Sequence, residues 1–310
     1  ILRKVHYAFS AFLCTACLVS CNDWLKPEPL SFYSPENTYV TKEGLEGALV
    51  SCRAMIRPEF IGNNSYACTE LMTSDVAVAG NIVAQTLKNF EIQLKPGAYG
   101  DSQIGTFWSK GYSAIQKANT IISRVQAADE ITENDKNTIL AEGYFHRSYW
   151  YYKLVNQFGD VPFIDKEVTT PKLDFYSHTR SSILKRLRED MMFATRYLPE
   201  SAPHGAVSKA AGNHLLAKIC LACCDFDGAV AATTAVIDHS QHKLMEKRFG
   251  VNISDAQYNI ISDLFNRENI NSSENLEGIF LVEDKRLTEG GTSTLSLIHI
   301  SEPTRLLSIS

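Results

Sequence analysis

An aromatic-rich stretch that ends at a glycine, residues 142–167, constrains the fold of this chain more than any other part. It reads EGYFHRSYWYYKLVNQFGDVPFIDKE. Four large apolar residues recur at helical spacing and share one face: Phe145, Tyr149, Tyr152 and Val155. Trp150 and Tyr151 widen this surface, which predicts a helix that packs on more than one side. Gly159 then ends the helix.

Capping residues before apolar helical periods predict further helices. We expect helices over about 41–57, 101–128, 132–158, 179–198, 208–222 and 226–238, and a shorter one within 255–265. The expected caps are Thr41, Thr132, Thr179 and Ser208, and Pro58 is expected to end the first helix. Residues 76–100 lack a clean period and predict a long loop, whereas residues 276–282 predict a short strand.

The paired helices of residues 208–238 resemble a tetratricopeptide unit, with Ala229 as the small contact of the second helix. One such pair cannot bury its apolar face alone, so neighbouring pairs must stack. We expect two to three pairs between residues 101 and 238. The predicted fold class is mainly α, a tetratricopeptide-like helical repeat with loop-rich irregular regions. An irregular all-α domain is the alternative.

Composition limits the possible partners. The 310 residues are 45% hydrophobic and 21% charged, with a net charge of −5, so nothing indicates nucleic-acid binding. Cys220 and Cys223 form a C-x-x-C pattern inside an apolar helix. A zinc or redox site there would need a second ligand pair, and none is evident, so small packed thiols are the simpler interpretation. We expect no metal and no cofactor.

The first residues have the pattern of a bacterial lipoprotein leader. Arg3 and Lys4 precede an apolar run that is too short to span a bilayer, and Leu18-Val19-Ser20-Cys21 resembles a lipobox. We expect lipidation at Cys21, although a chance cysteine after an ordinary leader would look similar. The expected organisation is a signal peptide over 1–20, a tether and extended lead-in over 21–40, and a helical-repeat domain over 41–294.

Residues 295–310 have no helical or strand pattern that would continue the fold. They include LSLIHISEPTR, which matches the conceptual translation of an adapter used in sequencing libraries. We expect residues 295–310 to be such an artefact and the helical-repeat domain to be incomplete, the alternative being a genuine terminus.

Several segments together resemble the SusD/RagB family, the nutrient-binding surface lipoproteins of Bacteroidetes. They are the lipobox leader and the stretches WSKGYSAIQKANTII, AEGYFHRSYWYYKLVNQFGDVPF and HTRSSILKRLREDMMFATRYLP. The family usually has alanine after the arginine of the second stretch, where this chain has Arg147-Ser148. The resemblance implies a SusD-like α-superhelix at the outer membrane. It also implies non-enzymatic capture of a glycan or oligosaccharide, which passes to a SusC-like TonB-dependent transporter.

The residues themselves indicate a binding site only weakly. No catalytic motif appears. Glu142 and His146 are spaced like two metal ligands, but a surface helix pair explains them better. The aromatic run around Tyr149 could stack on sugar, but a packed core is the better interpretation. The candidate ligand-binding residues come from loops: Tyr66, Asp75, Asn81 and Tyr99.

Two function classes therefore remain after the sequence is read. The first is a glycan-binding surface lipoprotein that serves a transporter. The second is a helical-repeat lipoprotein that acts as a scaffold for a protein or peptide. The leader fits both classes, and the aromatic helix that ends in FGDVP favours the first.

Overall fold

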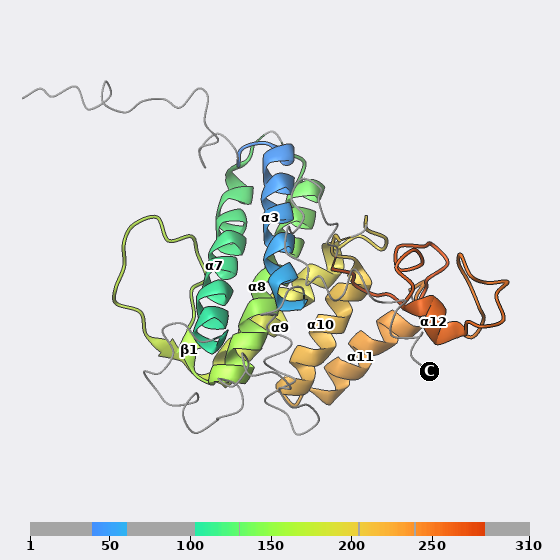
Figure 1. Cartoon of the computed structure of the whole chain (residues 1–310). Helices are drawn as coiled ribbons and strands as arrows, with labels where there is room; N and C mark the ends of the chain where they lie inside the picture. Colours follow the sequence, from blue (N-terminus) through green and yellow to red (C-terminus); the bar gives the residue numbers. More distant parts are fainter. Residues whose placement is uncertain (1–38, 61–102, 130, 204, 239, 283–310) are drawn as a thin grey trace, which may run out of the picture. The chain divides into compact units, whose positions relative to one another are not determined.

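The computed structural model describes residues 39–60, 103–129, 131–203, 205–238 and 240–282, and the side chains from Gly105 onward in the second range (Figure 1). The long helices of this part are α3 (Lys42–Phe60), α7 (Gln103–Arg124), α8 (Glu133–Phe158), α9 (Arg180–Tyr197), α10 (Lys209–Ala222) and α11 (Phe226–Ile237). The short elements are the 3₁₀ turn η2 (Val125–Ala127), α12 (Ile260–Leu264) and the strands β1 (Val161–Pro162) and β2 (Ser177–His178). The mainly α prediction is confirmed.

The predicted caps begin the helices as expected. The Thr132 hydroxyl accepts a hydrogen bond from the Asp135 amide, and Thr179 and Ser208 do the same for Ser182 and Ala211. The Thr41 hydroxyl accepts one from the Gly44 amide at 3.2 Å. Each bond satisfies an amide that has no partner within its own helix.

The two expected helix ends differ in outcome. Gly159 ends α8 with φ at 75°, a conformation that glycine adopts without steric cost. Pro58 does not end α3, which continues to Phe60. A proline in the last turn removes a single hydrogen bond, and this loss is small enough for the helix to run two residues further.

Helices that follow one another in sequence lie side by side, which is the packing expected of a repeat. α7 packs on α8, α8 on α9, α9 on α10 and α10 on α11. α8 also contacts α3, so it lies at the centre of the helices around it (Figure 1). Stability in such an array comes mainly from contacts between neighbours.

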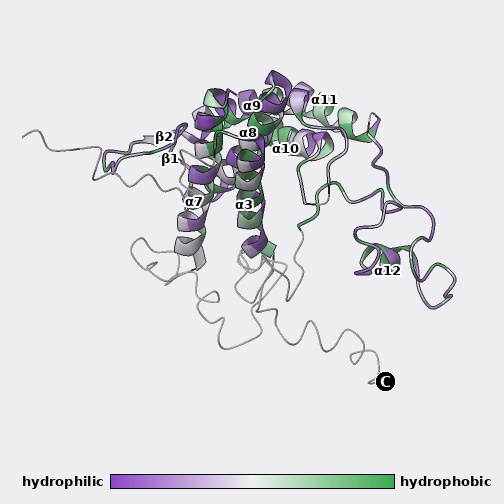
Figure 2. Ribbon diagram, turned by 90° about the horizontal axis from the view of Figure 1, so that it is seen from above, coloured by the Kyte–Doolittle hydropathy of each residue, from purple (hydrophilic) through white to green (hydrophobic). Residues whose placement is uncertain are grey.

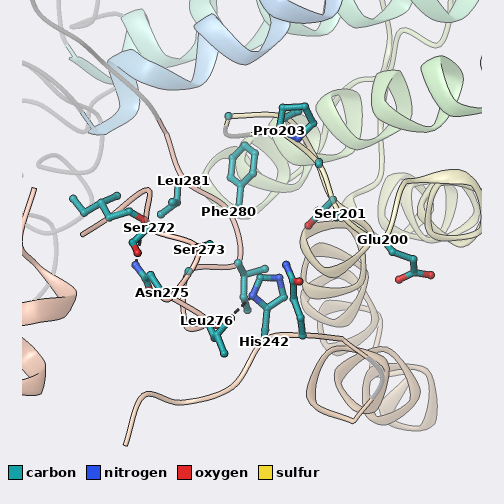
Figure 3. A pocket seen from close by; sticks show the side chains of 18 residues that line it. Glu200, Ser201, Pro203, His242, Ser272, Ser273, Asn275, Leu276, Phe280 and Leu281 are labelled. Atoms are coloured by element: carbon teal, nitrogen blue, oxygen red, sulfur yellow. Dashed lines mark hydrogen bonds between the residues drawn. The ribbon is translucent and has the colours of Figure 1, made fainter. Parts of the chain in front are cut away.

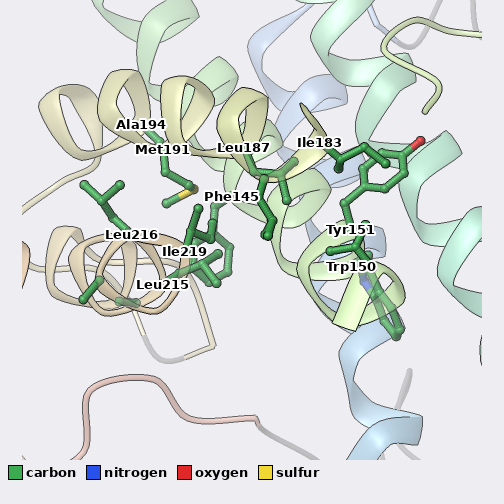
Figure 4. Close-up of a cluster of buried hydrophobic side chains, with 14 of the residues drawn as sticks. Phe145, Trp150, Tyr151, Ile183, Leu187, Met191, Ala194, Leu215, Leu216 and Ile219 are labelled. Atoms are coloured by element: carbon green, nitrogen blue, oxygen red, sulfur yellow. The ribbon is translucent and has the colours of Figure 1, made fainter. Parts of the chain in front are cut away.

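The core follows these contacts. Trp150 and Tyr151 of α8 are fully buried. On α9, apolar residues that recur at helical spacing predict the buried face, and all five of them are buried: Ile183, Leu187, Met191, Ala194 and the C-cap Leu198. Figure 4 shows the α9 residues facing Leu215, Leu216 and Ile219 of α10.

Two predicted faces are only partly confirmed. On α8, Phe145 and Val155 are buried as predicted, whereas Tyr149 and Tyr152 are only partly buried and Trp150 and Tyr151 are fully buried. On α7, helical spacing predicts that Trp108 is buried, but Trp108 is half-buried and the neighbouring Phe107 is buried. A helix covered on several sides has no single apolar stripe, so spacing alone does not fix its most buried line.

The interpretation of Glu142 and His146 as a surface pair was wrong, because both side chains are buried. The Glu142 carboxylate accepts two hydrogen bonds from Arg53 of α3, at 2.6 and 2.9 Å, and His146 Nε2 lies 3.5 Å from it. Burial alone would raise the pKa of the Glu142 carboxyl, but His146 and Arg53 outweigh burial and hold that pKa below its usual range. The ion pair of Glu142 and Arg53 therefore ties α8 to α3.

A second buried ion pair crosses the helices at Arg147, which is 1% exposed. Its guanidinium lies 2.5 Å from the Asp190 carboxylate of α9 and donates to the Asp165 carbonyl at 2.9 Å. Arg186 adds a second cation 3.2 Å from Asp190. Burial, only partly offset by these arginines, raises the pKa of the Asp190 carboxyl.

The chain after residue 239 is irregular, as Figure 2 shows around α12. Only Ile260–Leu264 is helical within the predicted 255–265 segment. The strand predicted over 276–282 was wrong, since the segment pairs with no neighbouring strand in the described part of the chain. One backbone hydrogen bond, from the Lys243 amide to the Leu276 carbonyl, holds it instead.

Candidate functional site

The sequence candidates for lipidation and ligand binding all fall outside the described residues. This applies to Cys21, Tyr66, Asp75, Asn81 and Tyr99. They therefore stay predictions, and the site below is built from other residues. Tyr149, the possible sugar platform, packs on Phe145 and Trp150 and donates its hydroxyl to Glu59, which agrees with the core interpretation.

A pocket of about 320 Å³ lies between the α9–α10 connection and residues 270–281 (Figure 3). Three separate stretches of chain contribute to its walls, and the lining residues lie within 200–203 and 205–208, within 241–242 and within 270–281. Its polar and aromatic lining includes Ser201, Gln241, His242, Ser273, Asn275 and Phe280. This mixture of hydroxyl, amide, imidazole and ring is the chemistry that binds a polar ligand with an apolar face.

Internal hydrogen bonds shape the wall formed by residues 270–281. The Asn275 amide group donates to the Ile270 carbonyl at 3.2 Å, and its side-chain oxygen accepts from the Glu277 amide. Phe280 packs against Phe145 of α8, with ring centroids 5.7 Å apart. The ring of Phe280 thus joins the pocket to the core, and the wall needs little reorganisation to receive a ligand.

His242 has one defined tautomer when it is neutral. Its Nδ1 lies 3.2 Å from the Leu276 carbonyl oxygen (Figure 3). A carbonyl can only accept, so Nδ1 carries the proton and Nε2 is left as an acceptor. Nε2 can therefore accept a hydrogen bond from a ligand hydroxyl.

The pocket carries little free charge. Among the described residues that line it, Glu200 is the only carboxylate, and it pairs with Lys209 at 2.5 Å. Most glycoside hydrolases need two carboxyl groups on opposite sides of the bond they cleave. The described residues that line this pocket do not offer that pair.

Sequence reasoning missed this pocket because its residues come from three distant stretches without a motif. The run Asn269–Glu277, rich in asparagine and serine, does indicate an irregular polar loop. Nothing in that run shows that it faces the turn before α10.

Successive packed helices, each in contact with the next, define a helical-repeat protein. Residues 45–221 match the family model SusD-like, described as "Starch-binding associating with outer membrane". The match covers more than half of the chain, which therefore belongs to the SusD-like family.

Relatives in sequence and in structure agree with this assignment. A SusD-like protein of Formosa agariphila is 29% identical over 243 residues, which cover 77% of this chain and 47% of that protein. A SusD superfamily structure from Bacteroides vulgatus superposes with a TM-score of 0.63 at 18% identity, over 79% of this chain and 51% of that one. The surface glycan-binding protein A of Bacteroides uniformis superposes with a TM-score of 0.61 at 18% identity, over 76% of this chain and 52% of that one. The chain thus spans about half the length of these relatives, and its tetratricopeptide-like helical architecture is confirmed.

None of the described helices is long and apolar enough to cross a bilayer. Within the described residues no three His, Cys, Asp or Glu side chains gather as they would around a metal ion.

Proposed function

We propose that this chain is part of a cell-surface lipoprotein that binds glycans or oligosaccharides and delivers them to a SusC-like TonB-dependent transporter. The observation that carries the proposal is the family match over residues 45–221, which include α8 and its neighbours. The protein acts by binding, without catalysis. The outer membrane is its location, and a lipid anchor holds it there.

The pocket of Figure 3 is the proposed glycan site within the described residues. Phe280 offers a ring face to a sugar, while His242 Nε2 and the Ser201 hydroxyl bond the sugar's hydroxyl groups. Ring stacking adds apolar contact at little entropic cost, and the hydrogen bonds fix the ligand's orientation.

Calorimetry on a panel of soluble polysaccharides, laminarin among them, tests this site. Phe280→Ala and His242→Ala should each weaken binding by about tenfold, the loss of roughly 1.4 kcal/mol. Phe265→Ala is the matched control, because Phe265 is 81% exposed and lies outside the pocket lining.

Phe280 also contacts the core, so the thermal melt of each variant is recorded beside its affinity. His242→Ala removes no aromatic core contact and keeps the test valid if Phe280→Ala unfolds. Wild-type affinity in both folded variants would exclude this pocket as the glycan site.

The lipid anchor is proposed at Cys21 on the strength of the Leu18–Cys21 motif. Two or more acyl chains hold a protein stably at a membrane, since each buried methylene contributes about 0.8 kcal/mol. Mass spectrometry of the mature N-terminus should find a lipidated cysteine, and Cys21→Ala should abolish it. A mature chain that begins elsewhere and bears no lipid would overturn the anchor.

The transporter is proposed from family membership alone, and a pull-down tests it. Tagged protein expressed in its own cells should retain a TonB-dependent transporter after mild detergent extraction. Cys21→Ser is a useful comparison, because loss of the anchor lowers the local concentration of the pair. Capture of other proteins without any transporter would contradict the proposal.

The alternative function, a scaffold for a protein or peptide, is favoured by one surface. Phe226, Val230 and Ile237 of α11 are 63–70% exposed and share a helix face, and much of α11 is coloured as hydrophobic in Figure 2. A chain that binds a defined protein but none of the glycans tested would establish this alternative.

A further inference from the structure

A second hollow lies on another side of the helices, between α7 and the segment that joins β1 to β2. This α7 groove has a volume of about 440 Å³. Its outer wall belongs to the loop between β1 and β2, which extends away from α7 in Figure 1. The groove shares no lining residue with the pocket of Figure 3.

The inner wall of the α7 groove is held rigidly. The Asn119 side chain, which is fully buried, donates to the Ile164 carbonyl at 2.7 Å, and the Ile164 amide donates to the Tyr151 hydroxyl at 2.6 Å. The Tyr112 hydroxyl donates to the Pro162 carbonyl at 2.8 Å. α7 and α8 therefore fix residues 162–164 before any ligand arrives, which lowers the entropic cost of binding.

The outer wall, residues 169–176, is exposed throughout. It brings hydroxyl groups from Thr169 and Thr170 and the ring of Phe175 to the groove. The Lys172 ammonium lies 5.5 Å from the centroid of that ring, and Phe175 is 40% exposed. One wall thus combines a cation, an aromatic ring and two hydroxyls.

Both charged side chains that line the α7 groove are basic, and the exposed Asp174 of the outer wall lies outside the lining. The lining residues, all within the described part of the chain, include Lys166 and Lys172 and no carboxylate. The neighbouring Glu167 carboxylate is held by Arg124 at 2.7 and 2.9 Å and is thereby neutralised. A hollow lined by one sign of charge attracts the opposite charge and concentrates it there.

We propose that the α7 groove binds an acidic saccharide, whose uronate or sulfate group lies between Lys166 and Lys172. The sugar ring contacts Phe175, and its hydroxyls bond Gln116 and the two threonines. An isolated small anion would use only the lysines, and a neutral sugar would leave both of them unused. The proposal rests on glycan binding as the general function, but it names a separate site and a charged ligand class.

Calorimetry with tetragalacturonate, and with maltotetraose as a neutral ligand of equal length, tests the charge requirement. The chain should bind tetragalacturonate at least tenfold more tightly. Raising NaCl from about 0.1 M to about 1 M shortens the Debye length from about 10 Å to about 3 Å, which should weaken binding of the acidic ligand. Equal affinity for the two ligands would overturn the proposal.

Variants locate the site. Lys166→Ala/Lys172→Ala should lower tetragalacturonate affinity at least tenfold, whereas Lys185→Ala/Lys247→Ala removes the same charge from exposed positions outside the groove and should change it little. Phe175→Ala should weaken tetragalacturonate binding without altering its salt dependence. Equal losses in the two lysine pairs would show a general charge effect and refute the site.

The remaining outcomes separate this proposal from the general function. Binding of neutral polysaccharides with no binding of tetragalacturonate would refute the groove and leave glycan capture intact. Sodium sulfate that competes fully at millimolar concentration would reduce the groove to a simple anion site and overturn the saccharide assignment. Failure of every glycan would overturn the general function as well.

Discussion

The buried pair of Arg147 and Asp190 allows a sharp prediction about stability. Replacing Arg147 by Met leaves the Asp190 carboxylate, which is 3% exposed, with only Arg186 at 3.2 Å. Removing one partner of a buried pair typically costs about 3–5 kcal/mol. The remaining cation places Arg147→Met near the lower end of that range.

The reverse change should cost more. Asp190→Leu leaves the buried guanidinium with the Asp165 carbonyl at 2.9 Å, the Asn119 side chain at 3.3 Å and the Tyr144 ring, whose centroid is 4.9 Å away. None of these groups carries a charge, so we expect a loss toward about 5 kcal/mol.

The double variant Arg147→Met/Asp190→Leu removes both charges. Its expected cost is only about 1 kcal/mol, because apolar side chains of similar volume often replace a buried pair without loss. The coupling energy between the two positions is therefore several kcal/mol, far above the few tenths seen for independent sites.

Urea denaturation followed by circular dichroism measures all four proteins. The midpoints should shift with constant slopes, as expected when only the native state's stability changes. A double variant as unstable as the sum of the two single variants would refute the reasoning, since the pair would then contribute as two independent groups.

Three further predictions follow from other buried groups. Trp150→Ala should lower the free energy of unfolding by about 3–5 kcal/mol, measured by the same denaturation, whereas a loss below about 1 kcal/mol would contradict its place in the core. The pKa of Glu142 is lower in the folded state, so its carboxylate stabilises the fold above the unfolded-state pKa of 4.5, and this stabilisation is lost as pH falls through the folded-state pKa. Glu142→Gln should therefore flatten the acid side of the curve of unfolding free energy against pH, and an unchanged acid side would contradict this. Iodoacetamide should modify the exposed Cys224 well before Cys52, because burial raises the pKa of the Cys52 thiol to about 12; equal rates by mass spectrometry would be the contrary result.

The positions of the helices could be predicted from the sequence because their signals are local. Thr132, Thr179 and Ser208 begin helices through a hydrogen bond to a backbone amide three residues ahead. Such a bond depends on neighbours in the chain, so a sequence can reveal it. Gly159 is predictable for the same reason, since its positive φ is a local requirement.

The degree of burial could be predicted only where a helix has one apolar stripe. α9 has such a stripe and was predicted correctly, whereas α8 contacts several helices and hides even Glu142 and Arg147. A buried charge is tolerated because of partners distant in sequence, and no spacing rule shows those partners. Arg53 lies 89 residues from Glu142.

The candidate sites were the least predictable part. His242 and Ser201 meet in one pocket only after α10 and α11 have folded between them. Lys166 and Lys172 both line the α7 groove because buried groups on two helices hold the preceding residues 162–164 in place. The candidates chosen from the sequence, Tyr66 to Tyr99, lie outside the described residues and stay predictions.

Residues 162–167 come directly before the outer wall of the α7 groove and are held in place by hydrogen bonds, which has a consequence for how such proteins diverge. Hydrogen bonds from α7 and α8 secure residues 162–167 up to Glu167, and β2 secures the chain again at Ser177. The residues in between can change in length or composition at small cost, because closing a loop becomes only slowly more expensive as the loop lengthens. Substitutions and insertions there can alter the ligand preference that we propose for the groove, while the folding of the helices is left untouched. Residues 169–176 are thus a natural place for new specificity to evolve, and for a designed binding loop to be grafted.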